Sequence, residues 1–269
     1  MLTRSISKLA NYLGLATAYV KLNLKAQMEY RTAFISQVVA MFLNNCVWVL
    51  FWGVFFTRFP VVKGYGATDV ITLWAVSAAG FGIAHTICGN ALHLAGLIAR
   101  GQLDAWMLYP RALLPHIVIG RMSPPSLGDA LFGYAVYIVF VHPDLTHFAL
   151  FTVLTISVAF VFTGFSVLTG SLSFFLGNSE SLSEQWRFAM ITFSTYPASL
   201  FDGAIKLILY TVIPAGFVSY LPIEALRKLS LTDAFLAFGG SAAVVACAVA
   251  VFYLGLRRYE SGNLAEMRG

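Results

Sequence analysis

The chain has 269 residues, of which 59% are hydrophobic and only 11% are charged. Soluble domains carry about 25% charged residues, so this composition excludes a single water-soluble globular domain and indicates an integral membrane protein. The formal net charge is +5, but the basic residues lie between the apolar runs, as in the loops of multi-span membrane proteins. That distribution argues against a nucleic-acid partner.

Residues 1–30 are expected to form an N-terminal helix in the cytoplasmic membrane interface. Apolar residues recur there at helical spacing, opposite lysines that suit anionic head groups. The apolar positions are Ile6, Leu9, Leu13, Val20 and Leu24, and the lysines are Lys8, Lys21 and Lys25. Arg4 and the apolar stretch after it resemble a signal peptide, but that stretch is short and lysines follow it, so we expect no cleavage.

Residues 31–269 are expected to form one all-α transmembrane domain with six spans. The apolar runs lie at about 33–56, 70–91, 126–141, 148–175, 201–220 and 234–256. A helix of about 20 apolar residues crosses the hydrocarbon core of a bilayer, so most of these runs are long enough. Pro124 and Pro125 cannot lie inside an unbroken helix, so residues 112–120 are expected in the interface and the third span to begin near Ser126.

Several spans carry residues that favour contact with other helices. Asn44 and Asn45 lie in the middle of the first span and should face inward or toward another subunit, because an amide in hydrocarbon needs a partner. The second span has a row of small residues that permits close helix packing. That row comprises Ala75, Ala78, Ala79, Gly82 and Gly89.

Charged residues are expected only near the ends of spans. Asp129 should lie at the cytoplasmic edge, within reach of Arg121. Asp202 and Lys206 are four residues apart, on one helix face, and could neutralise each other near the inner boundary. Pro214 with Gly216 predicts a kink or break in the outer half of the fifth span.

The turn between the third and fourth spans contains His142, Asp144 and His147. This set resembles a metal site superficially. However, a short turn between two spans more often carries solvated polar residues and an Asp helix cap, and we expect no metal here.

Two polar connections lie on the predicted cytoplasmic side. In the elbow, Leu92–Pro115, a short amphipathic helix over Leu103–Leu108 is limited by Gly101 before it and Pro110 after it. In the connection 177–187, Ser181 and Glu184 fit a capping box that begins a helix running through Met190.

Counting basic residues predicts the orientation of the chain. The proposed inner segments hold 13 lysines and arginines, with Lys206 and Arg268 among them, and the outer segments hold 4. The side richer in Lys and Arg is cytoplasmic. Both termini are therefore expected in the cytoplasm, and the number of spans should be even.

The motifs of several enzyme and carrier classes are absent from the sequence. It has no GxxxxGK[ST] loop for ATP hydrolysis and no HExxH metal motif. Acids away from the span ends, which ion-coupled carriers normally use, are not expected. An intramembrane enzyme or a non-transport scaffold remains the alternative class, with His85, His93 and His116 as the only candidate reactive groups.

The sequence resembles the permease subunits of type-2 ABC exporters, in particular small six-span permeases of uncharacterised transport systems. The resemblance rests on four stretches in order: residues 27–31 (QMEYR), 101–104 (GQLD) with 108–110 (LYP), 196–201 (YPASLF), and 213–222 (IPAGFVSYLP). Each stretch is weakly specific by itself, but the four in this order are fairly specific, and the resemblance covers nearly the whole chain. The family implies an exporter in the bacterial inner (plasma) membrane that is not itself an enzyme.

The same resemblance implies the partners. ATP and Mg would bind a separate ABC ATPase subunit, with no cofactor in this chain, and a second permease would pair through the first and fifth spans. The elbow helix and the helix over 180–190 would contact the ATPase. The coupling candidates are Gly101, Leu103, Asp104, Trp106, Leu108 and Glu184. The dimer or pathway candidates are Asn44, Asn45, Asp202, Lys206 and Pro214. The substrate is expected to be hydrophobic or amphiphilic.

Overall fold

The computed structural model describes the backbone of residues 2–260 and the side chains of residues 14–260. Arg268 lies outside the described residues, and the side chains of Arg4, Ile6, Lys8, Leu9 and Leu13 lie outside the described side chains. All regular secondary structure of the described chain is helical apart from one antiparallel hairpin, β1 (Val61–Val62) and β2 (Tyr65–Gly66).

The long helices are α1 (Leu2–Glu29), α2 (Arg31–Arg58), α3 (Ala67–Cys88), α8 (Leu145–Gly170) and α13 (Leu231–Leu256). The shorter α-helices are α4 (Leu94–Ala99), α5 (Leu103–Met107), α6 (Leu113–Val118), α7 (Pro124–Val136), α9 (Ser173–Leu176), α10 (Glu180–Ser194), α11 (Gly203–Thr211) and α12 (Leu221–Lys228). Single turns of other helix types are η1 (Gly89–His93), η2 (Tyr137–Val141), η3 (Ala198–Leu200) and η4 (Gly216–Tyr220).

Five helical segments are long and apolar enough to cross a membrane, and a bent pair raises the number to six. The five segments are 31–58, 67–99, 124–141, 145–176 and 231–256. They match the predicted first, second, third, fourth and sixth spans to within a few residues, apart from the second, which runs eight residues further. The all-α, multi-span fold is therefore confirmed.

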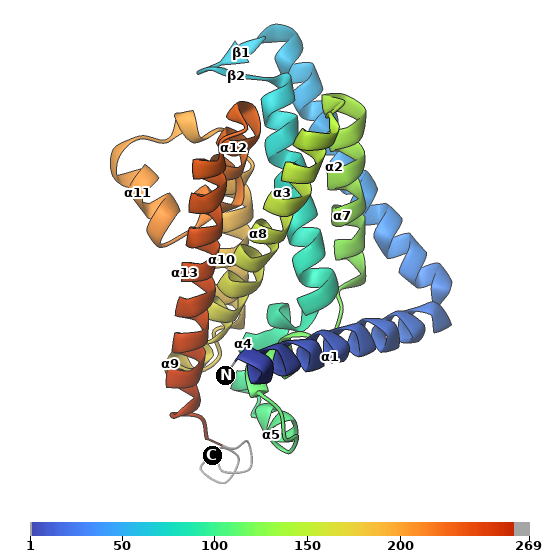
Figure 1. Ribbon diagram of the computed structural model, residues 1–269, viewed down its shortest axis with the longest axis vertical. Helices are drawn as coiled ribbons and strands as arrows, with labels where there is room; N and C mark the ends of the chain where they lie inside the picture. Colours follow the sequence, from blue (N-terminus) through green and yellow to red (C-terminus); the bar gives the residue numbers. More distant parts are fainter. Residues whose placement is uncertain (1, 261–269) are drawn as a thin grey trace.

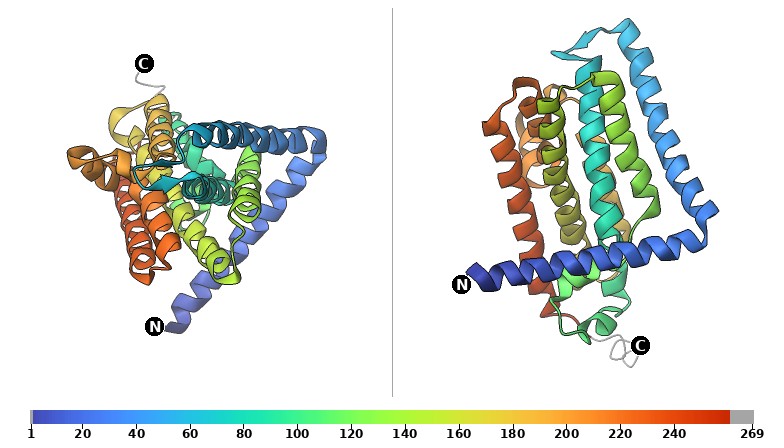
Figure 2. Two further views of the ribbon diagram at one scale, coloured as in Figure 1. Left: turned by 90° about the horizontal axis from the view of Figure 1, so that it is seen from above. Right: turned by 45° about the vertical axis from the view of Figure 1, so that its right-hand side comes forward.

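The spanning helices form one bundle, and α1 runs across one end of it (Figures 1 and 2). Helix α3 is central and packs against α7 and α8, while α2 packs against α7 and α13 against α8. We call the end with α1, α4, α5 and α9 the α1 end, and the opposite end, with β1, β2 and α12, the hairpin end.

Small residues bring the central helices into contact, as the sequence predicts. A Cβ atom added at Gly82 on α3 would overlap the backbone of Ala130 on α7, and one added at Gly80 would overlap the side chain of Val158 on α8. On α7, a Cβ at Gly133 would lie 2.5 Å from the carbonyl oxygen of Ala75. The helix axes can lie this close only because no side chain stands between them.

Two predicted helix starts differ from the structure. Helix α7 begins at Pro124, two residues before the predicted Ser126, because proline is tolerated in the first helical turn, where its missing N–H is not needed. The predicted capping box of Ser181 and Glu184 is wrong: α10 begins at Glu180 with Ser179 before it. The Ser179 hydroxyl instead hydrogen-bonds to that of Ser173, at 2.8 Å.

The fifth predicted span, 201–220, is not a continuous helix. Helix α11 ends at Thr211, Pro214 follows, and the segment 216–228 is inclined by 84° to α11. Proline lacks the N–H for the helical hydrogen bond, so the predicted break is confirmed.

The predicted position of Asp202 and Lys206 near the inner boundary is wrong. Helix α10 begins at the α1 end, where Glu180 pairs with Arg100 at 3.2 Å. It ends beside α3, where the hydroxyls of Ser194 and Ser77 are 3.1 Å apart. The chain has therefore crossed most of the bundle before it reaches Asp202. Moving Lys206 to the hairpin end changes the count of basic residues to 12 against 5, which leaves the predicted orientation unchanged.

Asp144 caps α8, as predicted for the polar turn. Its carboxylate accepts hydrogen bonds from the backbone N–H of His147 at 2.8 Å and from the ring Nδ1 of His147 at 2.7 Å. These two hydrogen bonds hold the pKa of Asp144 below its usual value. The contacts account for the turn as a helix cap.

Candidate functional site

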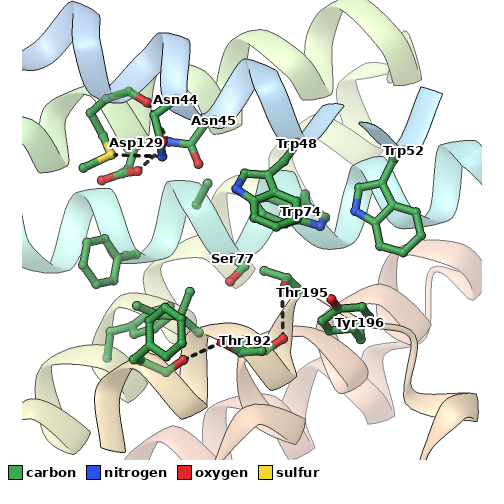
Figure 3. A pocket seen from close by; sticks show the side chains of 16 residues that line it. Asn44, Asn45, Trp48, Trp52, Trp74, Ser77, Asp129, Thr192, Thr195 and Tyr196 are labelled. Carbon is green, nitrogen blue, oxygen red and sulfur yellow. Dashed lines mark hydrogen bonds between the residues drawn. The ribbon is translucent and has the colours of Figure 1, made fainter. Parts of the chain in front are cut away.

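A cavity of about 490 Å³ lies among α2, α3 and α10, with one residue each from α7 and α8 (Figure 3). Its lining residues are Met41, Asn44, Asn45, Trp48, Trp52, Trp74, Ser77, Ala78, Phe81, Asp129, Phe162, Phe188, Ile191, Thr192, Thr195 and Tyr196. The volume lies in the range of small-molecule binding sites.

Helix α2 presents two different faces. The cavity face carries Asn45, Trp48 and Trp52, which recur every three or four residues, so that they share one side of a helix. The opposite face is aliphatic and exposed. Its residues include Val39, Leu43, Val47, Leu50 and Val54. This division separates a surface suited to lipid or another subunit from a polar, aromatic surface that faces the cavity.

Asn45 and Asp129 meet at one end of the cavity. The Asn45 side-chain amide donates a 2.7 Å hydrogen bond to Oδ1 of Asp129, and both residues are buried. Oδ2 of Asp129 is buried and has no hydrogen-bond partner among the described residues. A buried carboxylate oxygen without a partner is costly, and such a group marks a candidate functional position.

The prediction that Asp129 lies at a cytoplasmic edge with Arg121 is wrong. Arg121 is exposed, and the described structure contains no ion pair between the two residues. At Gly128, a Cβ atom would overlap the carbonyl oxygen of Val38, so the backbones of α7 and α2 are in contact there. That approach places Asp129 against Asn45 inside the bundle.

Aromatic side chains form one wall of the cavity (Figure 3). The rings of Trp48 and Trp74 stack, with centroids 5.4 Å apart and planes inclined by 26°. Tyr196 lies edge-on to Trp52 at 6.0 Å. The indole N–H groups of Trp52 and Trp74 are buried without an acceptor in the described structure.

Three of the remaining polar residues of the lining, Ser77, Thr192 and Thr195, have hydrogen-bond partners within the protein. Ser77 pairs with Ser194, and the Thr192 and Thr195 hydroxyls donate to backbone carbonyls of α10 at 2.9 and 2.8 Å. The lining contains one carboxylate and no lysine, arginine or histidine. The cavity can therefore enclose an apolar molecule and offers it a single acidic group.

The five dimer or pathway candidates do not gather at one place. Asn44 and Asn45 line the cavity, and Asn45 faces inward as predicted. Asp202 and Lys206 are exposed and line a separate cleft at the hairpin end, together with Lys63 and Glu224. Neither forms an ion pair with the other among the described residues. Pro214 is buried at the break after α11.

The elbow candidates form a short helix at the α1 end. Gly101 adopts a φ of +67°, which favours glycine, and α5 begins two residues later. Leu103 is fully buried, whereas Leu108 at the other end of α5 is 85% exposed. Trp106 packs edge-on against His116 with centroids 5.1 Å apart. The elbow is thus anchored on one side and presents apolar side chains on the other.

Two further coupling candidates, Asp104 and Glu184, have different surroundings. Asp104 lies beside Tyr259, just after α13 and so close to the end of the last span. Burial raises the pKa of Tyr259 to about 12, and the Asp104 carboxylate adds to that rise. Glu184 is exposed on α10.

The three histidines considered for an enzyme lie on different elements. His85 on α3 contacts the Ser166 hydroxyl at 3.2 Å and the Phe81 carbonyl at 3.1 Å. His116 on α6 contacts the Tyr19 hydroxyl at 2.6 Å, and His93 belongs to η1. None of them lines the cavity.

Most of the cavity cannot be predicted from the sequence, including Trp74, Thr192, Thr195, Tyr196 and the pairing of Asp129 with Asn45. One signal was available: Asn45, Trp48 and Trp52 follow each other at helical spacing on the first span. The partners on α3, α7 and α10 carry no such signal, because they come together only in the folded bundle.

Comparison with known proteins identifies the family. The sequence profile of a family described as ABC-2 family transporter protein matches residues 42–263, which is more than four fifths of the chain. Neither the curated proteins nor the solved structures include a match to it. The profile includes the whole cavity lining apart from Met41. With its apolar helices and this match, the chain belongs to the ABC-2 transporter family and is a multi-span membrane permease.

Proposed function

We propose that this permease is the membrane subunit of an ATP-driven exporter, which moves a hydrophobic or amphiphilic molecule. A separate ABC ATPase subunit would bind ATP and Mg and drive the transport. The observation that carries the proposal is the aromatic cavity inside the bundle, joined by α3 and α10 to the elements at the α1 end. The sequence has no GxxxxGK[ST] loop, which supports hydrolysis by a partner subunit.

The elbow is suited to receive force from that partner. Leu103 and Trp106 anchor α5, while Met107, Leu108 and Tyr109 are exposed beside each other. An ATPase that binds these exposed side chains would displace a helix that is packed against the bundle through Leu103 and Trp106. The Arg100–Glu180 ion pair joins the segment before α5 to the first residue of α10.

The connection from the elbow to the cavity is short. Helix α4 and η1 link α5 to α3, which supplies Trp74, Ser77 and Phe81 to the lining. Helix α10 reaches from Glu180 to Ser194, beside Ser77. Dimerisation of the ATPase subunits would displace both helices and change the side from which the cavity is open.

A second permease is part of the proposal. Helix α2 is the least buried candidate span, and α11 exposes Ile205, Leu207 and Ile208. These apolar faces are suited to pair with the same surfaces of an identical or related chain. Lipid would cover the remaining apolar surface, with the α1 end on the cytoplasmic side of the bacterial inner membrane.

Co-purification tests the proposal directly. The tagged chain, expressed with the ATPases of its host and purified in mild detergent, should retain an ABC ATPase. Replacing Asp104 and Trp106 with alanine should abolish substrate-stimulated ATP hydrolysis while membrane insertion remains intact. Lys63→Ala at the hairpin end is the control and should couple normally. Transport by the purified chain alone, driven by an ion gradient, would contradict the proposal. Normal coupling in the variant with Asp104 and Trp106 replaced would show that the elbow does not transmit the motion of the ATPase.

An intramembrane enzyme or a scaffold is the alternative, and neither has a specific observation in its favour. Turnover of a substrate by the chain without an ATPase would support an enzyme. Failure to retain any ATPase would favour a scaffold.

A further inference from the structure

We propose that the cavity among α2, α3 and α10 binds a lipophilic cation, with Asp129 as the opposing charge and the tryptophan faces as the cation-binding wall. The binding site is inferred from the residues that line the cavity. That the bound cation is also the transported molecule rests on the proposed function.

The charge of the lining favours a cation. Asp129 is the only carboxylate in the lining, and no basic side chain accompanies it. The Asn45 amide satisfies Oδ1 but carries no charge, and Oδ2 has no partner among the described residues. A negative charge inside a membrane protein is normally balanced by a cation. A positively charged ligand would supply the balance that the protein does not.

The aromatic wall of the cavity also favours a cation. Trp48 and Trp74 lie on facing helices with their rings stacked at 5.4 Å, and Trp48 is 42% exposed. The face of a tryptophan ring attracts a cation more strongly than that of tyrosine or phenylalanine. Asn45, which bonds to Asp129, lies one helical turn before Trp48 on α2. The Asp129 carboxylate and the tryptophan rings therefore border the same cavity (Figure 3).

The apolar remainder of the lining favours a cation that is itself lipophilic. Met41, Phe81, Phe162, Phe188 and Ile191 offer no hydrogen bonds from side-chain oxygen or nitrogen. The hydroxyls of Thr192 and Thr195 are already bonded to the backbone. The few polar groups of the lining would replace the water of a small hydrated ion only in part. A cation whose charge is surrounded by apolar groups fits both the apolar walls and the single carboxylate.

Two ions of matched shape and opposite charge test the proposal. The purified full chain is titrated by calorimetry in a nonionic detergent with tetraphenylphosphonium and, separately, with tetraphenylborate. We expect saturable binding of the phosphonium and at least tenfold weaker binding of the borate. Equal affinities would show that the cavity recognises only apolar bulk and would overturn the proposal.

Variants assign the binding to the site. Asp129→Asn keeps the shape of the side chain and should weaken phosphonium binding at least tenfold. Glu29→Gln, which removes an acid at the exposed end of α1, should leave the affinity unchanged. Trp74→Phe should weaken binding severalfold, and this variant serves if Asp129→Asn does not fold. Unchanged affinity in a folded Asp129→Asn or Trp74→Phe protein would overturn the proposal.

Failure of the site and failure of the proposed function are distinguishable. If an ATPase co-purifies and couples normally but the phosphonium does not bind, the cavity inference is overturned and the permease function stands. If the phosphonium binds through Asp129 but no ATPase accompanies the chain, the site stands and the ATP-driven function falls.

Discussion

Asn45 on α2 donates a 2.7 Å hydrogen bond to the carboxylate of Asp129 on α7, across 84 residues of sequence. The same two spans also approach each other at Gly128, where a Cβ atom would overlap the Val38 carbonyl oxygen, and through the edge-on rings of Phe42 and Phe132. The hydrogen bond fixes the position of the one acidic group in the cavity. The other carboxylate oxygen is left without a partner among the described residues.

Removal of the amide should destabilise the bundle. Asn45→Ala leaves the buried Asp129 without its donor, and an unsatisfied buried acceptor costs about 1–3 kcal/mol. A fall in the thermal unfolding midpoint of the purified protein is therefore expected. Asn44→Ala, at the exposed neighbouring position, is the control and should leave the midpoint within a degree or two of wild type. Equal effects of the two substitutions would contradict the assignment.

Close packing of α3 on α7 should make Gly82 intolerant of a methyl group. Gly82→Ala forces a Cβ into the backbone of Ala130, and overpacking of this kind costs about 1–3 kcal/mol. Gly239→Ala on α13 is the matched control, because a Cβ there meets no atom within 4 Å. That substitution should be neutral or stabilising, since alanine favours helix more than glycine. Thermal unfolding in detergent measures both.

The contact between α1 and α6 should weaken as the pH falls. Burial first, and the positive charge of Arg111 second, hold the pKa of His116 below its usual value, so the folded protein favours the neutral ring beside Tyr19. A lowered histidine pKa means that the stabilisation is present above the unfolded pKa and is lost as the pH falls below it. Protease sensitivity of α1 should therefore rise between pH 7 and pH 5.5.

His116→Gln is the control for this pH effect. Glutamine can still bond to the Tyr19 hydroxyl but does not titrate, so the pH dependence of cleavage within α1 should become flatter. An unchanged pH profile in this variant would show that another group controls the contact.

Leu103 and Leu108, at the two ends of the elbow helix, should respond differently to truncation. Leu103→Ala opens a space in the core and should destabilise the chain by about 2–5 kcal/mol. Leu108→Ala removes an 85% exposed side chain and should leave thermal stability unchanged. If the elbow binds an ATPase, Leu108→Ala should reduce the amount of ATPase that co-purifies. Full recovery of the ATPase with Leu108→Ala would place the binding surface elsewhere.

Much of the fold could be predicted from the sequence because it depends on local properties. The lengths of the apolar runs predict the first, third, fourth and sixth spans to within a few residues, and the pair Pro124–Pro125 places the start of the third within two residues. Pro214 predicts the break in the fifth segment, and the small residues of 70–91 predict close packing. Each of these features follows from hydrophobicity, helix length or the missing N–H of proline within a few neighbouring residues.

The depth and the partners of polar residues were decided only by the tertiary structure. Sequence order places Asp129 beside Arg121, and Asp202 and Lys206 near the inner boundary, only if distance along the chain equals distance through the membrane. Helix α10 carries the chain across most of the bundle before Asp202, and the contact at Gly128 turns Asp129 toward Asn45. The sequence by itself determined that this protein crosses a membrane several times and has a short amphipathic helix in the elbow between two spans. The cavity depended on which helices meet, because its walls come from five helices that no local pattern links.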